Sequence, residues 1–241
     1  MEKITARDIA KMIDHSLLNP VITPDDVANG CAIAKKYNTA SVCVKPCDVD
    51  QAVLLLKETD VAVTTVISFP HGSNLTEVKV FEAQKALKSG CSELDMVLNI
   101  GWLLGGRYSE VMDDIRAVCD IAHAGEAIVK VILENAYLKD ELIEIASKLS
   151  ERAGADFIKT STGYAPSGAK LHDLRIMRAA TSGRVGIKAA GGIRTLDAAL
   201  KIRSIGVSRF GCTVTEKIVS EAREREAAGS LILPEIVDEE F

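Results

Sequence analysis

The sequence has no apolar run long enough to cross a membrane and no excess of positive charge. Its longest apolar stretches, such as Val61–Val66, fall far short of the roughly 20 residues that a membrane helix needs. The net charge of −5 gives no broad attraction to nucleic acid or to an anionic membrane. Residues 1–8 carry charges where a signal peptide needs an apolar run. We therefore expect a cytoplasmic protein that has neither nucleic acid nor a membrane as a partner.

Cysteine and histidine are too sparsely placed to build a metal centre. The 6 cysteines form no CxxC pair and have no histidine partner at the spacing of zinc ligands. No cluster of histidines and carboxylates supplies ligands for another metal, which argues against a metal-dependent lyase. Several cysteines stand among apolar residues, where the thiol usually packs as a small buried hydrophobe. The sequence thus predicts no cofactor and a reducing compartment.

What the chain does have is a regular alternation of short apolar runs and helix-like segments. No linker rich in proline, glycine or serine divides its 241 residues, a length that suits one α/β domain. The apolar runs recur at the spacing of one βα unit, and several are nearly continuous, as in parallel strands covered by helices. The predicted strands are Met12–His15, Ser41–Lys45, Ala62–Ser68, Glu93–Asn99, Ala127–Glu134, Asp156–Thr160, Val185–Ala189 and Ser208–Gly211.

Helix signals fall between these strands. Asn74–Glu77 resembles a capping box at a helix start, and Gly90 stands where the same helix should stop. A second helical pattern begins near Asp140 and again ends at a glycine, Gly154. The apolar faces of these helices are interpreted as core.

Eight βα units can close into a barrel or form an open, doubly wound sheet. Charged and polar residues accumulate at the ends of many different predicted strands. In a barrel these ends converge on one mouth, where active sites are built, whereas an open sheet gathers fewer of them at its switch point. We therefore predict an α/β fold, a single-domain (β/α)8 TIM barrel over residues 1–241, with a short C-terminal tail from about residue 230.

Three lysines lie inside apolar strands that follow one another along the chain. Lys159 and Lys188 lie late in their strands, near the mouth, whereas Lys130 lies earlier and should point into the barrel below it. Burial of an ammonium group without a partner is strongly unfavourable, so a purely structural role requires buried ion pairs. Alternatively, neighbouring ammonium groups disfavour each other's charge and lower the pKa of a lysine. A neutral lysine amine can attack a carbonyl carbon and form a Schiff base, and we expect that nucleophile at Lys159.

Two acids accompany these lysines. Asp95 alternates with Glu93 on one strand face, and Asp14 occupies the first predicted strand. A carboxylate inside the barrel can pair with a lysine or shuttle protons, which imine chemistry requires repeatedly. His15 and His71 stand beside turns and are interpreted as hydrogen-bonded structure.

Glycine-rich turns follow the last three predicted strands. Glycine lets backbone N–H groups approach an anion closely, and helix N-termini add a favourable dipole. In barrels, phosphate is often held by the loops after strands seven and eight. The predicted phosphate-binding residues are Gly163, Gly191, Gly192, Arg194, Gly211 and Thr213.

Whole segments of the chain also match the motifs of one known family. The lysine-centred segment Phe157–Gly163 and the aspartate-centred segment Glu93–Gly101 are the specific ones. The other matching segments are Ile13–Leu18, Val42–Val44, Phe69–Gly72, Thr76–Lys79, Lys130–Glu134 and Lys188–Arg194. With these motifs the chain resembles the deoxyribose-phosphate aldolases over nearly its whole length.

The resemblance implies a class I aldolase that needs no metal. Such an enzyme cleaves 2-deoxy-D-ribose 5-phosphate reversibly to acetaldehyde and D-glyceraldehyde 3-phosphate. By position, Lys159 matches the Schiff-base lysine, Lys188 the lysine that perturbs it, and Asp95 the acid that works in proton transfer through a water. The glycine-rich turns fall where the family holds phosphate. The residues assigned to a supporting role in the pocket are Asp14, Cys43 and Lys130.

The chain departs from the family's pattern at a few positions. After the eighth strand, Gly211 is followed by Thr213 and Val214 where the family commonly has serine, so Thr213 would supply the hydroxyl. Asn135 stands where threonine is more usual, and Tyr164 occupies a position that varies between aromatic residues and lysine. These changes bear on phosphate binding and leave the chemistry intact.

Two other functions fit much of the same pattern. A class I aldolase for a different phosphorylated sugar would keep Lys159 and change only the pocket. A non-catalytic sugar-phosphate-binding barrel would not require Lys159, Lys188 and Asp95 together, which favours the enzyme. The sequence also leaves a homo-oligomer open, because apolar residues near the C-terminus can pack on the barrel or seal a subunit contact.

Overall fold

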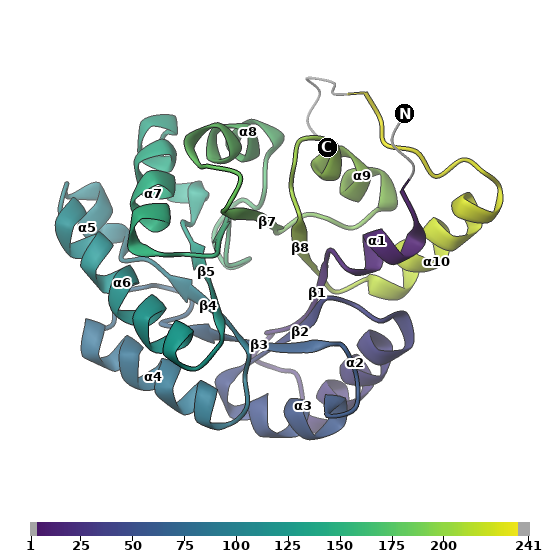
Figure 1. Cartoon of the computed structure of the whole chain (residues 1–241), viewed down its shortest axis with the longest axis horizontal. Helices are drawn as coiled ribbons and strands as arrows, with labels where there is room; N and C mark the ends of the chain where they lie inside the picture. The colour runs from purple at the N-terminus through teal and green to yellow at the C-terminus, as the bar shows by residue number, and fades with distance from the viewer. Residues whose placement is uncertain (1–3, 236–241) are drawn as a thin grey trace.

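The computed structural model describes residues 4–235 and shows a closed barrel of parallel strands surrounded by helices (Figure 1). Strands adjacent in sequence are adjacent in the barrel, and the last strand pairs with the first. This confirms the (β/α)8 TIM barrel predicted from the sequence. The strands are β1 (Ile13–Leu17), β2 (Ser41–Val44), β3 (Ala62–Ile67), β4 (Glu93–Val97), β5 (Ile128–Ile132), β6 (Phe157–Lys159), β7 (Gly186–Ala190) and β8 (Arg209–Cys212).

Helices cover the outside of the barrel between successive strands (Figure 1). One short helix precedes the first strand, and it packs against the helix that follows the last strand. The helices are α1 (Ala6–Ala10), α2 (Pro24–Tyr37), η1 (Pro46–Asp48), α3 (Val49–Leu56), α4 (Thr76–Lys88), α5 (Ile100–Leu104), α6 (Tyr108–Ala124), η2 (Asn135–Tyr137), α7 (Asp140–Ala153), α8 (Leu171–Ala180), α9 (Leu196–Ser204) and α10 (Thr215–Ala227).

The strands are buried on both faces, which explains their nearly continuous apolar sequences. In β4, for example, every residue is buried, including Glu93 and Asp95. The register of the pairing then decides which inward side chains become neighbours. Asp95 lies opposite Lys130 on the next strand, and Lys159 lies opposite Lys188. Sheet pairing thus sets the acid beside one lysine and the other two lysines beside each other.

The C-terminal ends of two helices follow the predicted turn chemistry. α7 ends at Gly154, whose φ of 101° is left-handed, and α4 ends just before Gly90, which has a φ of 92°. Residues other than glycine pay a steric cost in this region, so glycine suits both helix ends.

The capping box predicted at Asn74–Glu77 is wrong. α4 begins at Thr76, with Leu75 in the N-cap position, and no side chain caps it. The Asn74 side chain donates a hydrogen bond to Glu82 instead. Glu82 also accepts the backbone N–H of Ser68, so tertiary contacts to the preceding loop replace the local cap.

The C-terminal segment packs on the barrel as far as it is described. α10 ends at Ala227, and Leu231 is buried among the apolar core residues. Residues 236–241, which include Ile236 and Val237 of the predicted apolar stretch, lie outside the described residues.

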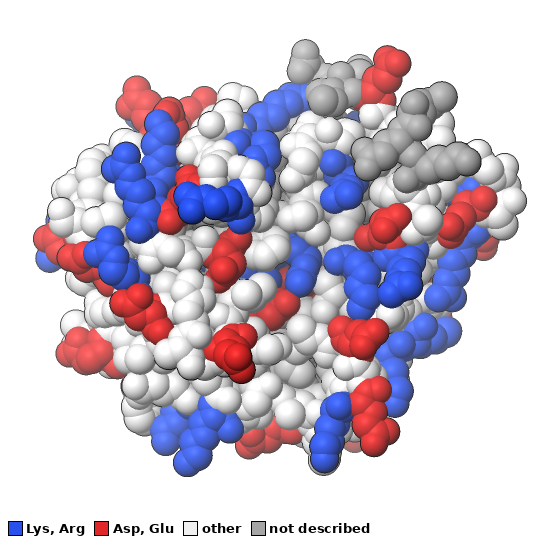
Figure 2. Space-filling view, in the orientation of Figure 1, with Lys and Arg blue, Asp and Glu red and all other residues white. Residues whose placement is uncertain are grey.

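The outer surface mixes charges of both signs. Figure 2 shows lysine and arginine side chains interspersed with aspartate and glutamate over the face seen in Figure 1. Within residues 4–235, none of the helices combines the length and apolarity that spanning a bilayer would take.

Candidate active site

A cavity of about 300 Å³ lies at the carboxyl ends of the strands. Side chains of β1, β2, β6, β7 and β8 form its wall, together with the loops that follow the last three strands. It is lined by Lys159, Lys188, Asp14, Cys43 and the predicted phosphate-binding residues Gly163, Gly191, Gly192, Arg194, Gly211 and Thr213. Further lining residues are Ser16, Leu18, Asn19, Thr162, Tyr164, Ala190, Ile193 and Cys212. The structure therefore gathers most of the predicted site residues around one space.

Two lysines meet one carboxylate oxygen at the floor of this cavity. Lys159 Nζ and Lys188 Nζ each lie 2.7 Å from Asp95 Oδ2. All three side chains are almost completely buried. Lys188 also forms an ion pair with Oδ2 of Asp14, on the first strand. β4, β6 and β7 thus place the predicted nucleophile, acid and second lysine in direct contact.

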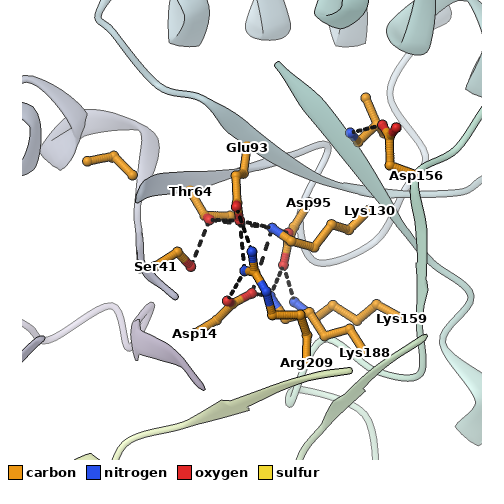
Figure 3. A network of polar contacts seen from close by, with 12 residues as sticks. Asp14, Ser41, Thr64, Glu93, Asp95, Lys130, Asp156, Lys159, Lys188 and Arg209 are labelled. Atoms are coloured by element: carbon orange, nitrogen blue, oxygen red, sulfur yellow. Dashed lines mark hydrogen bonds and ion pairs between the residues drawn. The ribbon is translucent and has the colours of Figure 1, made fainter. Parts of the chain in front are cut away.

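Further charged side chains are joined to this contact in one network (Figure 3). Lys130 Nζ lies 2.6 Å from Glu93 Oε2 and 2.9 Å from Asp95 Oδ1. It is fully buried and is not one of the lining residues of the cavity, so it supports the site from beneath. Arg209 completes the network by contacting the carboxylates of Glu93 and Asp14. We call the seven side chains the buried charge cluster: Asp14, Glu93, Asp95, Lys130, Lys159, Lys188 and Arg209.

The environment of Lys159 favours the neutral amine. Burial lowers the pKa of Lys159 and outweighs the nearby Asp95 carboxylate, which opposes it. The positive charge of Lys188 lowers that pKa further, as predicted. A lysine with a lowered pKa offers a lone pair at a pH where an exposed lysine is protonated.

The pKa of Lys188 shifts in the opposite direction from that of Lys159. Burial alone would lower the pKa of Lys188, but Asp14 and Asp95 outweigh it, and the pKa rises. Lys130 follows the same rule: burial is outweighed by Asp95, Glu93 and Asp14, and its pKa is raised. Of these three lysines, only Lys159 therefore has a pKa below the ordinary lysine value.

The acids of the cluster are held in the ionised form. Burial would raise the pKa of Asp95, but Lys130, Lys159 and Lys188 bring it well below its usual range. The same opposition of burial and neighbouring cations lowers the pKa of Asp14 and of Glu93. Asp95 is therefore a resident carboxylate that can accept a proton from a neighbouring group.

Cys43 reaches the cavity from β2 as a thiol. Burial raises its pKa to about 11, and the nearby Asp95 carboxylate adds to that effect. Its side chain fills the wall beside the lysines without adding a charge.

The loops that follow β6, β7 and β8 line the same cavity as the two lysines. Gly163, Gly191 and Gly192 have φ values of 91°, 81° and 97°, which side-chain-bearing residues rarely adopt. A Cβ on Gly168 would lie 2.3 Å from the Gly191 carbonyl oxygen, so the loops after β6 and β7 pack backbone against backbone. This close contact requires glycine, and it fixes the turn in which the predicted phosphate ligands lie. Arg194 and Thr213 are exposed at the rim.

Some residues of the site were not found from the sequence. Glu134 is buried with a left-handed φ of 58° and accepts the Thr162 backbone N–H at 3.1 Å and its hydroxyl. Tyr164 donates its hydroxyl to the Leu18 carbonyl at 2.9 Å and joins the loops after β6 and β1. The sequence contained a signal for Glu134, because a charged residue directly after an apolar strand is unusual and Glu134 is the last residue of the family-like segment Lys130–Glu134. The contact of Tyr164 had no local signal.

His15 is placed as a structural residue, as predicted. His15 is buried, and its Nδ1 lies 2.8 Å from the Thr215 hydroxyl, outside the cavity lining. Burial lowers its pKa to about 4. In the part of the chain that the structure describes, His, Cys, Asp and Glu form no group of three or more that could hold a metal ion.

Comparison with known proteins places this geometry in a family context. The family model described as DeoC/LacD family aldolase matches residues 9–211. A deoxyribose-phosphate aldolase of Thermoanaerobacter sp. (strain X514) is 48% identical over 215 residues, which are 89% of this chain and 96% of the relative. The enzyme of that name from Thermococcus gammatolerans is 48% identical over 221 residues, 91% of this chain and 98% of the relative. A solved tetrameric deoxyribose phosphate aldolase from Aeropyrum pernix superimposes with a TM-score of 0.84 at 31% identity, covering 95% of this chain and 94% of its own.

Proposed function

The chain belongs to the DeoC/LacD family of aldolases and is a carbon–carbon lyase, and from this premise we propose how it works. We propose that it cleaves 2-deoxy-D-ribose 5-phosphate to acetaldehyde and D-glyceraldehyde 3-phosphate, and runs the reverse condensation, through a Schiff base on Lys159. Its curated relatives carry the name deoxyribose-phosphate aldolase over nearly their full length, which supports this substrate.

The contact of Lys159 with Asp95 and Lys188 carries the proposal. Lys159 Nζ lies 2.7 Å from Asp95 Oδ2 at the cavity floor, and its pKa is lowered by burial. The amine attacks C1 of the open-chain sugar, and loss of water gives an iminium ion. The positive nitrogen then withdraws electrons from the C2–C3 bond.

Cleavage removes one proton from the C3 hydroxyl and later adds one proton to C2. A base removes the proton of the C3 hydroxyl, the C2–C3 bond breaks, and C3 leaves as the aldehyde of glyceraldehyde 3-phosphate. The electron pair remains on C2 as an enamine with Lys159. Protonation of C2 and hydrolysis then release acetaldehyde and restore the amine.

We assign these proton movements to Asp95 and Lys188. Asp95 is ionised and contacts both lysines through one oxygen, so it can accept a proton through a water. Lys188 is protonated in the resting site because its pKa is raised, so it can donate a proton during the reaction, and its positive charge favours the neutral form of Lys159. Asp14 and Cys43 complete the wall around them, and Lys130 holds Asp95 from below.

The phosphate is assigned to the loops after β6, β7 and β8. Gly163, Gly191 and Gly192 turn there in conformations that bring backbone N–H groups close to an anion, and α9 begins just beyond Arg194. Gly211, Arg194 and Thr213 complete the proposed phosphate site from the other loops and the rim. In this proposal the loops bind the phosphate group while Lys159 binds C1, at the other end of the sugar chain.

The test is an aldol cleavage assay with matched lysine variants. Lys159→Met should lower kcat for 2-deoxyribose 5-phosphate by about 1000-fold or more, because the nucleophile is lost. Lys148→Met, at an exposed lysine paired with Glu144 on α7, is the control and should match the parent. Unphosphorylated deoxyribose should show a raised KM. Full activity of Lys159→Met, or no preference for the phosphorylated sugar, would contradict the proposal.

The setting of the enzyme is proposed on separate grounds. The cysteines of the described chain are all unpaired, which suits a reducing compartment, so we propose that the enzyme is cytoplasmic. We also propose a homo-oligomer, because one similar solved structure is tetrameric. Light scattering of the purified protein tests the second point.

A further inference from the structure

We propose that Arg209 is a positioning residue for the aldol reaction: it completes the positive charge that the buried carboxylates require, so that Lys159 is the surplus cation and gives up its proton. This inference rests on the proposed function, because it concerns the same nucleophile. It assigns a role in the chemistry to a residue that does not line the cavity in which the reaction takes place.

The geometry of Arg209 is that of a built contact. It starts β8, its side chain is only 15% exposed, and its two terminal nitrogens hold two acids at once. Nη1 lies 2.6 Å from Asp14 Oδ1, while Nη2 and Nη1 lie 2.9 and 3.2 Å from the two oxygens of Glu93. Figure 3 shows the guanidinium between these carboxylates. Such fork-shaped pairing is specific to arginine.

Neighbouring residues make room for this arginine. Its guanidinium lies 5.6 Å from the centre of the Phe157 ring on β6. That ring in turn occupies the space beside Gly186, where a Cβ would lie 2.3 Å from a ring carbon. The floor of the barrel is therefore shaped around Arg209 by residues from two further strands.

A count of charges shows why the position matters. Asp14 and Glu93 each form an ion pair with Arg209, whereas Asp95 forms ion pairs with lysines only. The three acids are matched by Lys130, Lys188 and Arg209, so a protonated Lys159 adds a fourth positive charge to three negative ones. Thr64 of β3 adds no charge, and Cys43 of β2 is a thiol because its pKa is raised. The groups of the network in Figure 3 that face one another, in strand order, are Asp14, Thr64, Glu93, Asp95, Lys130, Lys159, Lys188 and Arg209. The Cys43 thiol lies near Asp95 and the three lysines.

The loss of Arg209 reverses this count. With Lys159 neutral, the cluster would then carry one negative charge too many, so protonation of Lys159 would become more favourable. Asp14 and Glu93 would also attract Lys188 and Lys130 away from Asp95. Asp95 would then pair mainly with Lys159 and stabilise its protonated form. Both effects raise the pH at which Lys159 becomes a free amine.

The test follows the rate of imine formation on Lys159 against pH. The full-length protein is mixed with acetaldehyde, the imine is reduced with borohydride at intervals, and the labelled Lys159 peptide is quantified. The midpoint of the acid limb is read rather than the amplitude, so partial unfolding does not change the answer. The variants are Arg209→Met, Arg209→Lys, Glu93→Gln and the double variant Arg209→Met with Glu93→Gln.

Charge, rather than shape, should set the midpoint. Arg209→Met should raise it by about one pH unit, which lowers the rate on the acid limb by about tenfold. Arg209→Lys keeps the charge and should stay near the parent. Glu93→Gln should lower the midpoint, and the double variant, whose charges match again, should return to the parental value.

Two results would overturn the inference. An unmoved midpoint in Arg209→Met, with only a smaller amplitude, would make Arg209 a structural residue. If Arg209→Met does not fold, a midpoint in Glu93→Gln that stays at or above the parental value leads to the same conclusion. Failure of the proposed function looks different, since the parent itself would then carry no adduct on Lys159.

Discussion

Three lysines of the same chemistry differ by the number of carboxylates around them. Lys130 lies within 3.7 Å of three acids, Asp14, Glu93 and Asp95. Lys188 contacts two, and Lys159 contacts one, Asp95, among the described residues. Burial acts on all three, but only Lys159 has too few anions to offset it, and its pKa alone is lowered.

Replacement of Lys188 separates its charge from its proton. Lys188→Met removes a positive neighbour, so the pKa of Lys159 should rise and the acid limb of kcat/KM should move to higher pH. Lys188→Arg keeps the charge but cannot release a proton, so the limb should stay while kcat falls by about 100-fold or more. Steady-state profiles from pH 5 to 10 measure both. An unchanged limb in Lys188→Met would contradict the electrostatic role of Lys188.

The sequence identifies some of these residues for a physical reason. Lys159, Lys188 and Asp95 interrupt apolar strands, where burial of a charge is costly and therefore conspicuous. Arg209 begins its strand, where an exposed arginine is ordinary, and only the closure of β8 onto β1 reveals its contact with Asp14. The pKa order of the lysines was equally hidden, because it depends on distances across the barrel.

At the scale of elements, a buried ion pair joins α4 and α6 to the strand that carries Asp95. Lys79 Nζ lies 2.6 Å from Asp114 Oδ2 and donates to the Val97 carbonyl at 3.1 Å, and both charged side chains are buried. The Thr76 hydroxyl donates to the other oxygen of Asp114 at 2.8 Å. The pair therefore fixes the start of α4, which has no side-chain cap, and the end of β4.

Removing one partner of this pair should lower the free energy of unfolding more than removing both. Asp114→Ala leaves a buried ammonium group without its anion and should destabilise the protein by about 3–5 kcal/mol. Lys79→Met combined with Asp114→Leu removes both charges and should be far closer to the parent. Urea unfolding measures both variants. Equal losses in the single and the double variant would show that packing volume, and not the unpaired charge, decides.

The same region shows where local sequence reasoning fails. Asn74 and Glu77 have the residue types of a capping box. In the structure, however, Asn74 donates hydrogen bonds to Ser68 and Glu82, and these contacts replace the local cap. The sequence signals for the C-terminal ends of helices were more reliable, because the left-handed turns at Gly90 and Gly154 depend on the backbone of glycine itself.

At the scale of the whole molecule, repetition made the fold predictable. Each βα unit can be recognised from its own sequence, as an apolar run followed by a helical pattern. Closure was inferred from polar residues at many strand ends, and the pairing of β8 with β1 confirms it. The position of the cavity follows from closure, whereas its wall depends on loops such as the one that carries Tyr164, which no periodic pattern describes.

The buried carboxylates should make the barrel sensitive to acid. Asp14, Glu93 and Asp95 have pKa values lowered below those of the unfolded chain. Their contribution to stability is therefore fully present above the unfolded-state values, about pH 4, and is lost as the pH falls through the folded values. Thermal melts from pH 7 to pH 3 should show a steep loss below about pH 4.

The variant with both Arg209→Met and Glu93→Gln provides the matched comparison. It contains one buried carboxylate less and keeps the charge count, so its Tm should fall less steeply with acid than that of the parent. A parallel fall in both proteins would assign the acid sensitivity to surface groups.

The central claim is that Lys159, and neither Lys188 nor Lys130, forms the bond to substrate. The most direct measurement is borohydride reduction in the presence of 2-deoxyribose 5-phosphate or acetaldehyde, followed by peptide mass mapping. The account predicts one reduced adduct, on Lys159, that disappears in Lys159→Met. An adduct on Lys188 or Lys130 in the folded parent protein would contradict the choice of nucleophile, and no adduct with either compound would contradict the imine mechanism.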